Sequence, residues 1–110
     1  MRAHIYQIAF VPENVRLSFL SYDSLMHECG GKFPSERYAR VYSMEVTEEE
    51  PEAIYKLLNL HHPADYTARS LSVSDVVEYE RTDGSRVAYY CDTFGFQEIS
   101  FDRERICMPE

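Results

Sequence analysis

Two aspartates carry the clearest chemical signal in this sequence. Asp75 falls in the middle of the apolar side of the segment 71–81, and Asp92 follows a strand-like segment that ends at Cys91. A carboxylate in an apolar setting is either a turn anchor that accepts backbone N–H bonds or a functional group. If the two carboxylates faced each other, they could hold a metal ion or act as an acid–base pair. We expect Asp75 to be a structural turn anchor, and a metal-dependent enzyme using Asp75 and Asp92 is the alternative.

Cysteine and histidine offer two further kinds of chemistry. Cys91 could act as a nucleophile only if a nearby base removed its proton, and no motif places a histidine beside it. A cysteine in the middle of a strand more often packs as a small apolar residue. The histidine positions do not resemble zinc motifs, in which ligands come in closely spaced pairs; these positions are His4, His27, His61 and His62. We therefore predict no catalytic residue, no metal site and no cofactor.

The charge balance limits the possible partners. Eleven basic residues stand against nineteen acidic ones, which gives a net charge of −8. A field of this sign repels phosphate, so we expect no direct binding to nucleic acid. The glutamates gathered in the range 45–52 suit the start of a helix, where the helix dipole favours negative charge. The same acidity leaves a second alternative open, an acidic DNA mimic that inhibits a restriction enzyme.

Aromatic residues are numerous, with nine tyrosines and six phenylalanines. Base stacking would need interleaved Lys and Arg residues, and these are scattered along the chain. Most of the aromatic residues should therefore belong to a core. We expect Tyr66 and Tyr90 to face solvent and to anchor a protein partner, because tyrosine is common in interface hot spots.

Six segments have the strand-forming residues that would position these groups. Alternation and β-branched or aromatic content predict strands at 4–10, 15–19, 38–46, 71–81, 86–92 and 96–101. The fourth of these should be entered through a tight turn at residues 72–74. The order of these strands and the helices between them predicts a largely antiparallel sheet.

Two helices are predicted between these strands. Ser21 is a candidate N-cap of the first helix, which should stop at Gly30. The second helix begins either with a capping box formed by Thr47 and Glu50 or with Pro51 at its first position, and it ends before Pro63. The result is an α+β fold with a largely antiparallel sheet of about five to six strands and two helices on one face.

The turn at 82–85 decides which residues face each other across the hairpin. A two-residue turn would set Asp75 opposite Asp92, but it would also pair Arg81 with Arg86. A three-residue turn with Gly84 in the left-handed region pairs Glu80 with Arg86 and sets Asp75 opposite Cys91. We predict this second register, because it puts opposite charges together and leaves one coherent apolar face.

Length and composition set the remaining limits. A chain of 110 residues forms one domain by default, here 1–110. Its apolar stretches are too short to cross a membrane. The first residues lead directly into strand-like sequence with no apolar signal region. The three cysteines form no disulfide pattern. We therefore expect a cytoplasmic protein with no membrane partner.

Several motifs resemble those of the YodL-like domain family. They are Asn59, the run 62–66 (His-Pro-Ala-Asp-Tyr), the run 70–77 (Ser-Leu-Ser-Val-Ser-Asp-Val-Val) and the run 90–96 (Tyr-Cys-Asp-Thr-Phe-Gly-Phe). The strand around 38–42 and the helix after it also fit, so the resemblance covers most of the chain. One departure is clear: this sequence has Ala68 and Arg69 where the family commonly has Gly-His. A role for that histidine therefore does not carry over.

The resemblance implies a setting and no chemistry. Members of the family occur in mobile elements of bacteria, often within large proteins of conjugative plasmids and phages. We therefore expect a non-enzymatic accessory domain that binds another protein through the loop face around residues 65–74. The candidate binding residues are His62, Asp65, Tyr66, Arg69, Ser70, Ser72, Ser74 and Tyr90.

Overall fold

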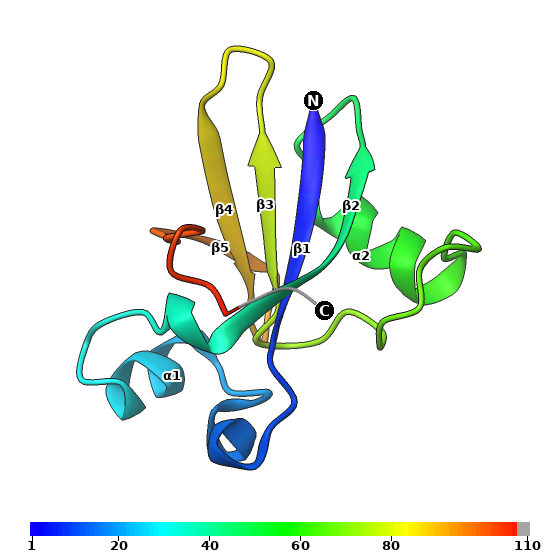
Figure 1. The fold of residues 1–110 in the computed structure, drawn as a ribbon. Helices are drawn as coiled ribbons and strands as arrows, with labels where there is room; N and C mark the ends of the chain where they lie inside the picture. The colour runs from blue at the N-terminus through cyan, green and yellow to red at the C-terminus, as the bar shows by residue number, and fades with distance from the viewer. Residues whose placement is uncertain (108–110) are drawn as a thin grey trace.

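The computed structural model describes residues 1–107 and shows an α+β fold (Figure 1). Over these residues, five antiparallel strands form one sheet in the order β2-β1-β3-β4-β5. The strands are β1 (Arg2–Ile8), β2 (Tyr38–Glu45), β3 (Val76–Glu80), β4 (Arg86–Cys91) and β5 (Phe96–Ile99). The α-helices are α1 (Tyr22–Glu28) and α2 (Pro51–Leu60), and the 3-10 helices are η1 (Pro12–Leu17) and η2 (Ser35–Arg37). The predicted α+β class with an antiparallel sheet is confirmed.

The segment predicted as a strand at 15–19 is wrong, because η1 occupies most of it. Pro12 lies at the first position of η1, where its fixed φ angle favours a helical turn. Alternation would have buried Val15, Leu17 and Phe19 together, yet of these three only Leu17 is buried. Two of the three alternating apolar side chains are therefore exposed, and the alternation does not mark the buried face of a strand.

The two α-helices pack against opposite faces of the sheet, which corrects the prediction that both cover one face. Ile54 and Leu58 of α2 pack with Val77, and Leu25 of α1 packs in a separate cluster with Val76. Because consecutive strand residues point to opposite faces, Val76 and Val77 must serve different sides of the sheet. In Figure 1, α2 lies beside the strands on the right, whereas α1 lies at the lower left.

The starts of both helices follow local rules. Ser21 caps α1 as predicted, since its hydroxyl accepts the backbone N–H of Ser24 at 3.2 Å. For α2 the structure decides between the two alternatives. Pro51 is at the first helical position, and Glu50 precedes it as an N-cap without a side-chain hydrogen bond. The capping box of Thr47 and Glu50 is therefore not formed.

The hairpin between β3 and β4 has the predicted register. Glu80 pairs with Arg86, and Val77 pairs with Tyr89. Gly84 has a φ of +89°, and the loop closes through the N–H of Arg81, which donates to the carbonyl of Ser85 at 2.8 Å. Below the ladder, the N–H of Cys91 donates to the carbonyl of Asp75 at 2.8 Å, so Asp75 lies opposite Cys91 as the three-residue turn requires.

Candidate functional site

The Asp75 carboxylate is fully buried and accepts four hydrogen bonds. Arg69 makes a bidentate pair with it, from Nη1 to Oδ2 at 3.0 Å and from Nη2 to Oδ1 at 2.8 Å. The N–H of Ser72 donates to Oδ2 at 2.8 Å, and the amide of Gln7 donates to the same atom at 3.2 Å. Bidentate arginine pairs of this kind fix both partners in position as well as neutralising the charge.

Two opposing effects act on the pKa of Asp75. Burial favours the neutral acid and raises the pKa to about 6, while Arg69 and the other donors favour the carboxylate and lower it. The desolvation effect is the larger, because the side chain has no exposed surface. Asp75 therefore titrates closer to neutral pH than an ordinary aspartate.

The chain between α2 and β3 is fixed by further side chains. The amide of Asn59 binds both backbone groups of Leu71, accepting its N–H at 2.7 Å and donating to its carbonyl at 2.9 Å. The Tyr66 hydroxyl and the Gln7 amide both donate to the carbonyl of Arg69, at 2.5 and 3.1 Å. This loop is therefore held in one conformation by side chains from β1 and α2 as well as its own.

Ser74 connects the loop to a distant segment. Its hydroxyl accepts the N–H of Phe19 at 3.1 Å, and its carbonyl accepts the Tyr38 hydroxyl at 2.6 Å. Both Ser74 and Phe19 have positive φ angles, +88° and +65°, which are costly for residues other than glycine. One hydrogen bond therefore joins two residues, Phe19 and Ser74, that both have a left-handed backbone conformation.

The Arg69 guanidinium lies over the ring of Phe19, with its central carbon 5.1 Å from the ring centroid. This is a cation–π contact, and Arg69 is fixed from behind by Asp75. Phe19 is 59% exposed and Arg69 is exposed as well, so the pair is presented to solvent.

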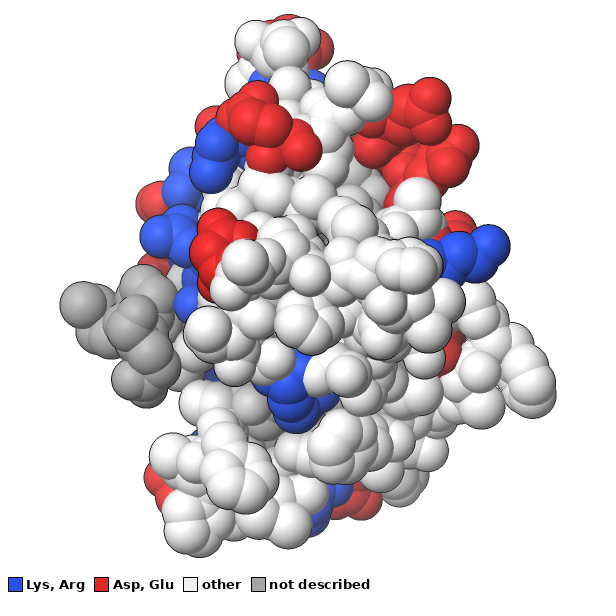
Figure 2. Space-filling view, turned by 90° about the vertical axis from the view of Figure 1, so that its right-hand side faces the viewer, with Lys and Arg blue, Asp and Glu red and all other residues white. Residues whose placement is uncertain are grey.

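Exposed apolar side chains continue along the segment 10–19. Phe10 is 100% exposed and Val15 is 64% exposed. Val11, in the same segment, is 38% exposed. We call the exposed Phe19–Arg69 pair the Phe19 surface. Figure 2 shows the side of the molecule that includes α2: acidic side chains gather in its upper part, and charged side chains are sparse across the middle and lower part.

Three of the predicted binding residues are buried, which corrects the expectation that they face a partner. Tyr66 and Ser74 are inside the loop network. Tyr90 is fully buried, donates its hydroxyl to the carbonyl of Leu20 at 2.8 Å and packs edge-on against Phe33. Strand alternation alone could not show that both sides of β4 are covered.

The other candidates lie at or near the surface. His62 is exposed, with its ring 6.3 Å from that of Tyr66. Asp65 is exposed and accepts the Tyr42 hydroxyl at 2.8 Å. Ser70 is exposed and Ser72 is half-buried. The loop therefore brings together Arg69, Ser70 and Ser72, while His62 and Asp65 lie further along it towards α2.

Asp92 and Cys91 have separate surroundings. Asp92 accepts the N–H of Tyr22 at 3.1 Å and that of Thr93 at 2.8 Å, so its carboxylate and that of Asp75 bind different partners. Cys91 is buried, and burial raises the pKa of its thiol to about 12. A thiol with that pKa is protonated at neutral pH and is a poor nucleophile.

Within residues 1–107, no three Asp, Glu, His or Cys side chains are placed to hold a metal ion.

A chain of polar side chains on the opposite sheet face was missed by sequence reasoning. His4 contacts the Ser43 hydroxyl through Nδ1 at 2.7 Å and Glu80 through Nε2 at 2.9 Å. Arg86 binds Glu80 at 3.2 Å and Glu78 at 3.1 Å. Serine hydrolases use the reverse arrangement, with serine at Nε2 and the acid at Nδ1. The contacts here follow the pairing of β2, β1, β3 and β4, and we interpret them as cross-strand pairs.

The acidic cluster at 45–52 is partly neutralised. Glu45 pairs with Arg2 at 2.6 Å, and Glu49 makes a bidentate pair with Arg81. A DNA mimic needs a row of free carboxylates spaced like phosphates. The carboxylates of Glu45 and Glu49 are not free, because each is paired with an arginine. The structure thus gives the DNA-mimic alternative little support.

Comparison with known proteins gives one match. A family model described as the YodL-like domain matches residues 2–101. Neither the curated proteins nor the solved structures contain a significant match to the chain. Among the helices of residues 1–107, none has the length and apolar character needed to span a membrane.

Proposed function

The chain belongs to the YodL-like domain family, and from that premise we propose that it is a non-enzymatic accessory domain that binds another protein. The setting in bacterial mobile elements is part of the proposal and rests on the resemblance alone. A cytoplasmic location is also part of it, supported by the free thiols of Cys29, Cys91 and Cys107.

The observation that carries the proposal is the Phe19–Arg69 pair. Aromatic residues and arginine are enriched in protein interfaces, and here the Arg69 guanidinium lies over the exposed Phe19 ring. Because Asp75 and Ser74 already hold the pair in place, a partner would lose little side-chain entropy in binding it.

The backbone of Phe19 supports the same interpretation. A φ of +65° costs about 1–2 kcal/mol for a residue with a side chain, and the exposed ring contributes little burial to offset that cost. Such strain is more common at functional sites than elsewhere. The partner's chemistry follows from the surface: a protein with an apolar pocket that accepts the Phe19 ring, and polar groups at its rim beside Arg69.

The first prediction is that the Phe19→Ala variant loses the partner. Removing the ring takes away the centre of the contact, which for a hot-spot residue costs about 2 kcal/mol or more, roughly thirtyfold in affinity. Affinity purification from the native host, with quantitative mass spectrometry, would compare the variant with the wild type.

Phe94→Ala is the matched control, because Phe94 is 95% exposed in the turn between β4 and β5, outside the Phe19 surface. We expect one protein to be recovered with wild type and Phe94→Ala and lost with Phe19→Ala. Equal recovery of every protein by all three forms would refute the Phe19 surface as the binding site.

A further inference from the structure

Within residues 1–107, β5 has a free edge. In this part of the chain the strand order places β5 at one end of the sheet, where it pairs with β4 alone. The N–H of Asp92 donates to the carbonyl of Gly95 at 2.9 Å, which makes Asp92 and Gly95 a hydrogen-bonded pair. Such pairs alternate along an antiparallel ladder, so Gln97 and Ile99 point their backbone groups towards β4. The N–H and C=O groups of Phe96 and Glu98 then point away from the sheet.

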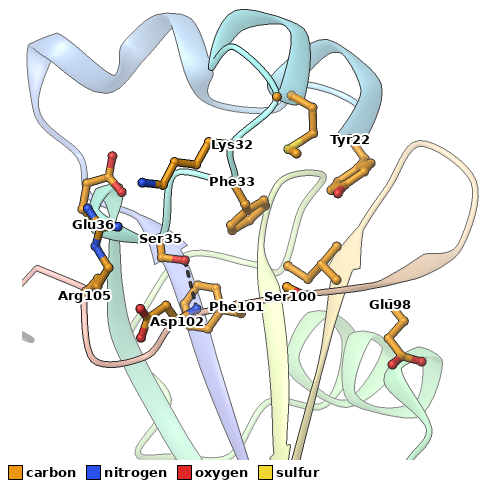
Figure 3. A pocket seen from close by; sticks show the side chains of 13 residues that line it. Tyr22, Lys32, Phe33, Ser35, Glu36, Glu98, Ser100, Phe101, Asp102 and Arg105 are labelled. Atoms are coloured by element: carbon orange, nitrogen blue, oxygen red, sulfur yellow. Dashed lines mark hydrogen bonds between the residues drawn. The ribbon is translucent and has the colours of Figure 1, made fainter.

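A groove runs beside this edge. It has a volume of about 820 Å³ and lies between residues 98–102, which are the end of β5 and its continuation, and α1 with the loop that follows it. Figure 3 shows Tyr22 and Phe33 on the upper side of the groove and Phe101 on the lower side. The Phe33 and Phe101 rings pack edge to face, with their centroids 6.0 Å apart. Both side chains are half-buried and line the groove, so part of their aromatic surface lies next to the outward backbone groups of β5.

We propose that this edge is a strand-addition site, which binds an extended peptide of another protein as a sixth strand next to β5. Backbone hydrogen bonds to Phe96 and Glu98 would hold the peptide. Its side chain opposite Ile99 would enter the groove beside Phe33 and Phe101, because paired residues share a face of the sheet. This site is distinct from the Phe19 surface and does not depend on it.

The charges specify the peptide further. The residue opposite Glu98 faces the other side of the sheet, where an exposed carboxylate favours a basic partner. The net charge of −8 attracts basic segments generally. The peptide should therefore alternate, with a lysine or arginine between two apolar residues that point towards the groove.

The opposite edge of the sheet is less suited to strand addition. In β2 the pairing with β1 skips Val41, a bulge that distorts the edge. The Tyr38 end of β2 is also covered, since its carbonyl accepts the N–H of Cys107 at 2.9 Å. In the part of the chain that the structure describes, β5 is therefore the edge with a regular free ladder and an adjacent groove.

Glu98→Pro is the decisive variant, since proline removes the outward N–H and leaves the bonds of β5 to β4 in place. The probe is a short capped peptide with a lysine between two phenylalanines, titrated by NMR. We expect binding to wild type with protection of the Glu98 amide from hydrogen exchange, and at least about a tenfold loss of affinity for Glu98→Pro.

Two controls separate the backbone from the side chain. Glu98→Ala keeps the N–H, and we expect its affinity for the peptide to fall much less than that of Glu98→Pro. A peptide of the same composition with the alternation broken should bind more weakly to the wild type. Circular dichroism and thermal unfolding would establish that both variants are folded.

Three outcomes would overturn the strand-addition site. They are equal affinity of Glu98→Pro and wild type, no protection of the Glu98 amide, and no binding of the alternating peptide. A dimer that Glu98→Pro converts to a monomer, without peptide binding, would identify a second copy of the chain as the occupant instead. None of these results bears on Phe19→Ala, so the two surfaces are tested independently.

Discussion

At the scale of single residues, Asp75 links parts of the chain that are far apart in sequence. It binds Gln7 of β1, Arg69 and Ser72, and through Arg69 it positions the ring contact with Phe19. Breaking a buried ion pair of this type is usually strongly destabilising, because the remaining groups lose their partners. The anchor role and the presentation of the Phe19 surface therefore depend on the same carboxylate.

We predict that the stability of the protein depends on pH through the ionisation of Asp75. Its pKa is about 6 in the folded protein, above the ordinary 3.8, so the folded state holds the proton more tightly than the unfolded state. The resulting stability is fully present below about pH 4 and is lost as the pH rises through about 6, a change of about 3 kcal/mol.

The Asp75→Asn variant lacks this titration and is the reference. Urea unfolding at several pH values would give the free energy of unfolding of both proteins. The wild type should lose stability relative to Asp75→Asn as the pH rises. The quantity to follow is the free energy of unfolding of the wild type relative to that of Asp75→Asn. If it stayed constant or increased with pH, burial would not be the dominant effect on the pKa of Asp75.

At the scale of elements, the β3–β4 hairpin sets what lies next to Asp75. Its three-residue loop needs Gly84 in the left-handed region, and the register then brings Glu80 to Arg86 and Cys91 to Asp75. A turn shorter by one residue would move every side chain of β4 to the other face. The turn therefore decides that Asp75 and Asp92 are not paired.

Gly84→Ala should destabilise the protein by about 1–2 kcal/mol, because a Cβ at a φ of +89° is strained. No heavy atom lies within 4 Å of a Cβ at that position, so the effect is conformational and not steric crowding by neighbours. Gly84→Asn should cost less, since asparagine tolerates this region. Urea denaturation would measure both.

Thr82→Ala is the control in the same exposed turn, and it should change the stability by no more than about 0.5 kcal/mol. If Gly84→Ala behaved like Thr82→Ala, the left-handed conformation at Gly84 would not hold in solution.

At the scale of the whole molecule, the sheet is covered on both faces. One core contains Ile54 of α2 with Val77 and Tyr79, and the other contains Leu25 of α1 with Val76 and Tyr90. Central strands covered on both sides bury nearly every side chain, as β3 does. This is why tyrosines that alternation alone would place at the surface are buried.

The two cores should respond independently to truncation. We expect Leu25→Ala to cost about 2–5 kcal/mol and Ile54→Val about 0.5–1.5 kcal/mol. In the double variant the two costs should add to within about 0.5 kcal/mol, because the residues lie on opposite sides of the sheet and share no cluster.

Chemical denaturation of the wild type, the two single variants and the double variant completes the cycle. A coupling energy above about 1 kcal/mol would mean that α1 and α2 pack in one core, as the prediction of both helices on one face had implied.

The sequence by itself determined the features that depend on near neighbours. The cap at Ser21, the turn at Gly84 and the pairing of Glu80 with Arg86 all follow from residues a few positions apart. Local hydrogen bonds, φ preferences and cross-strand charges decide such features, and all three can be evaluated along the chain.

Only the tertiary structure decided which residues meet across long separations. The sequence does not indicate that Arg69 lies over Phe19 or that His4 contacts Ser43. The expectation from the sequence that Tyr66 and Tyr90 face solvent was wrong, because both are buried. A period-two pattern specifies that side chains alternate, but which face is covered depends on where α1 and α2 pack, and that is fixed by contacts between segments tens of residues apart.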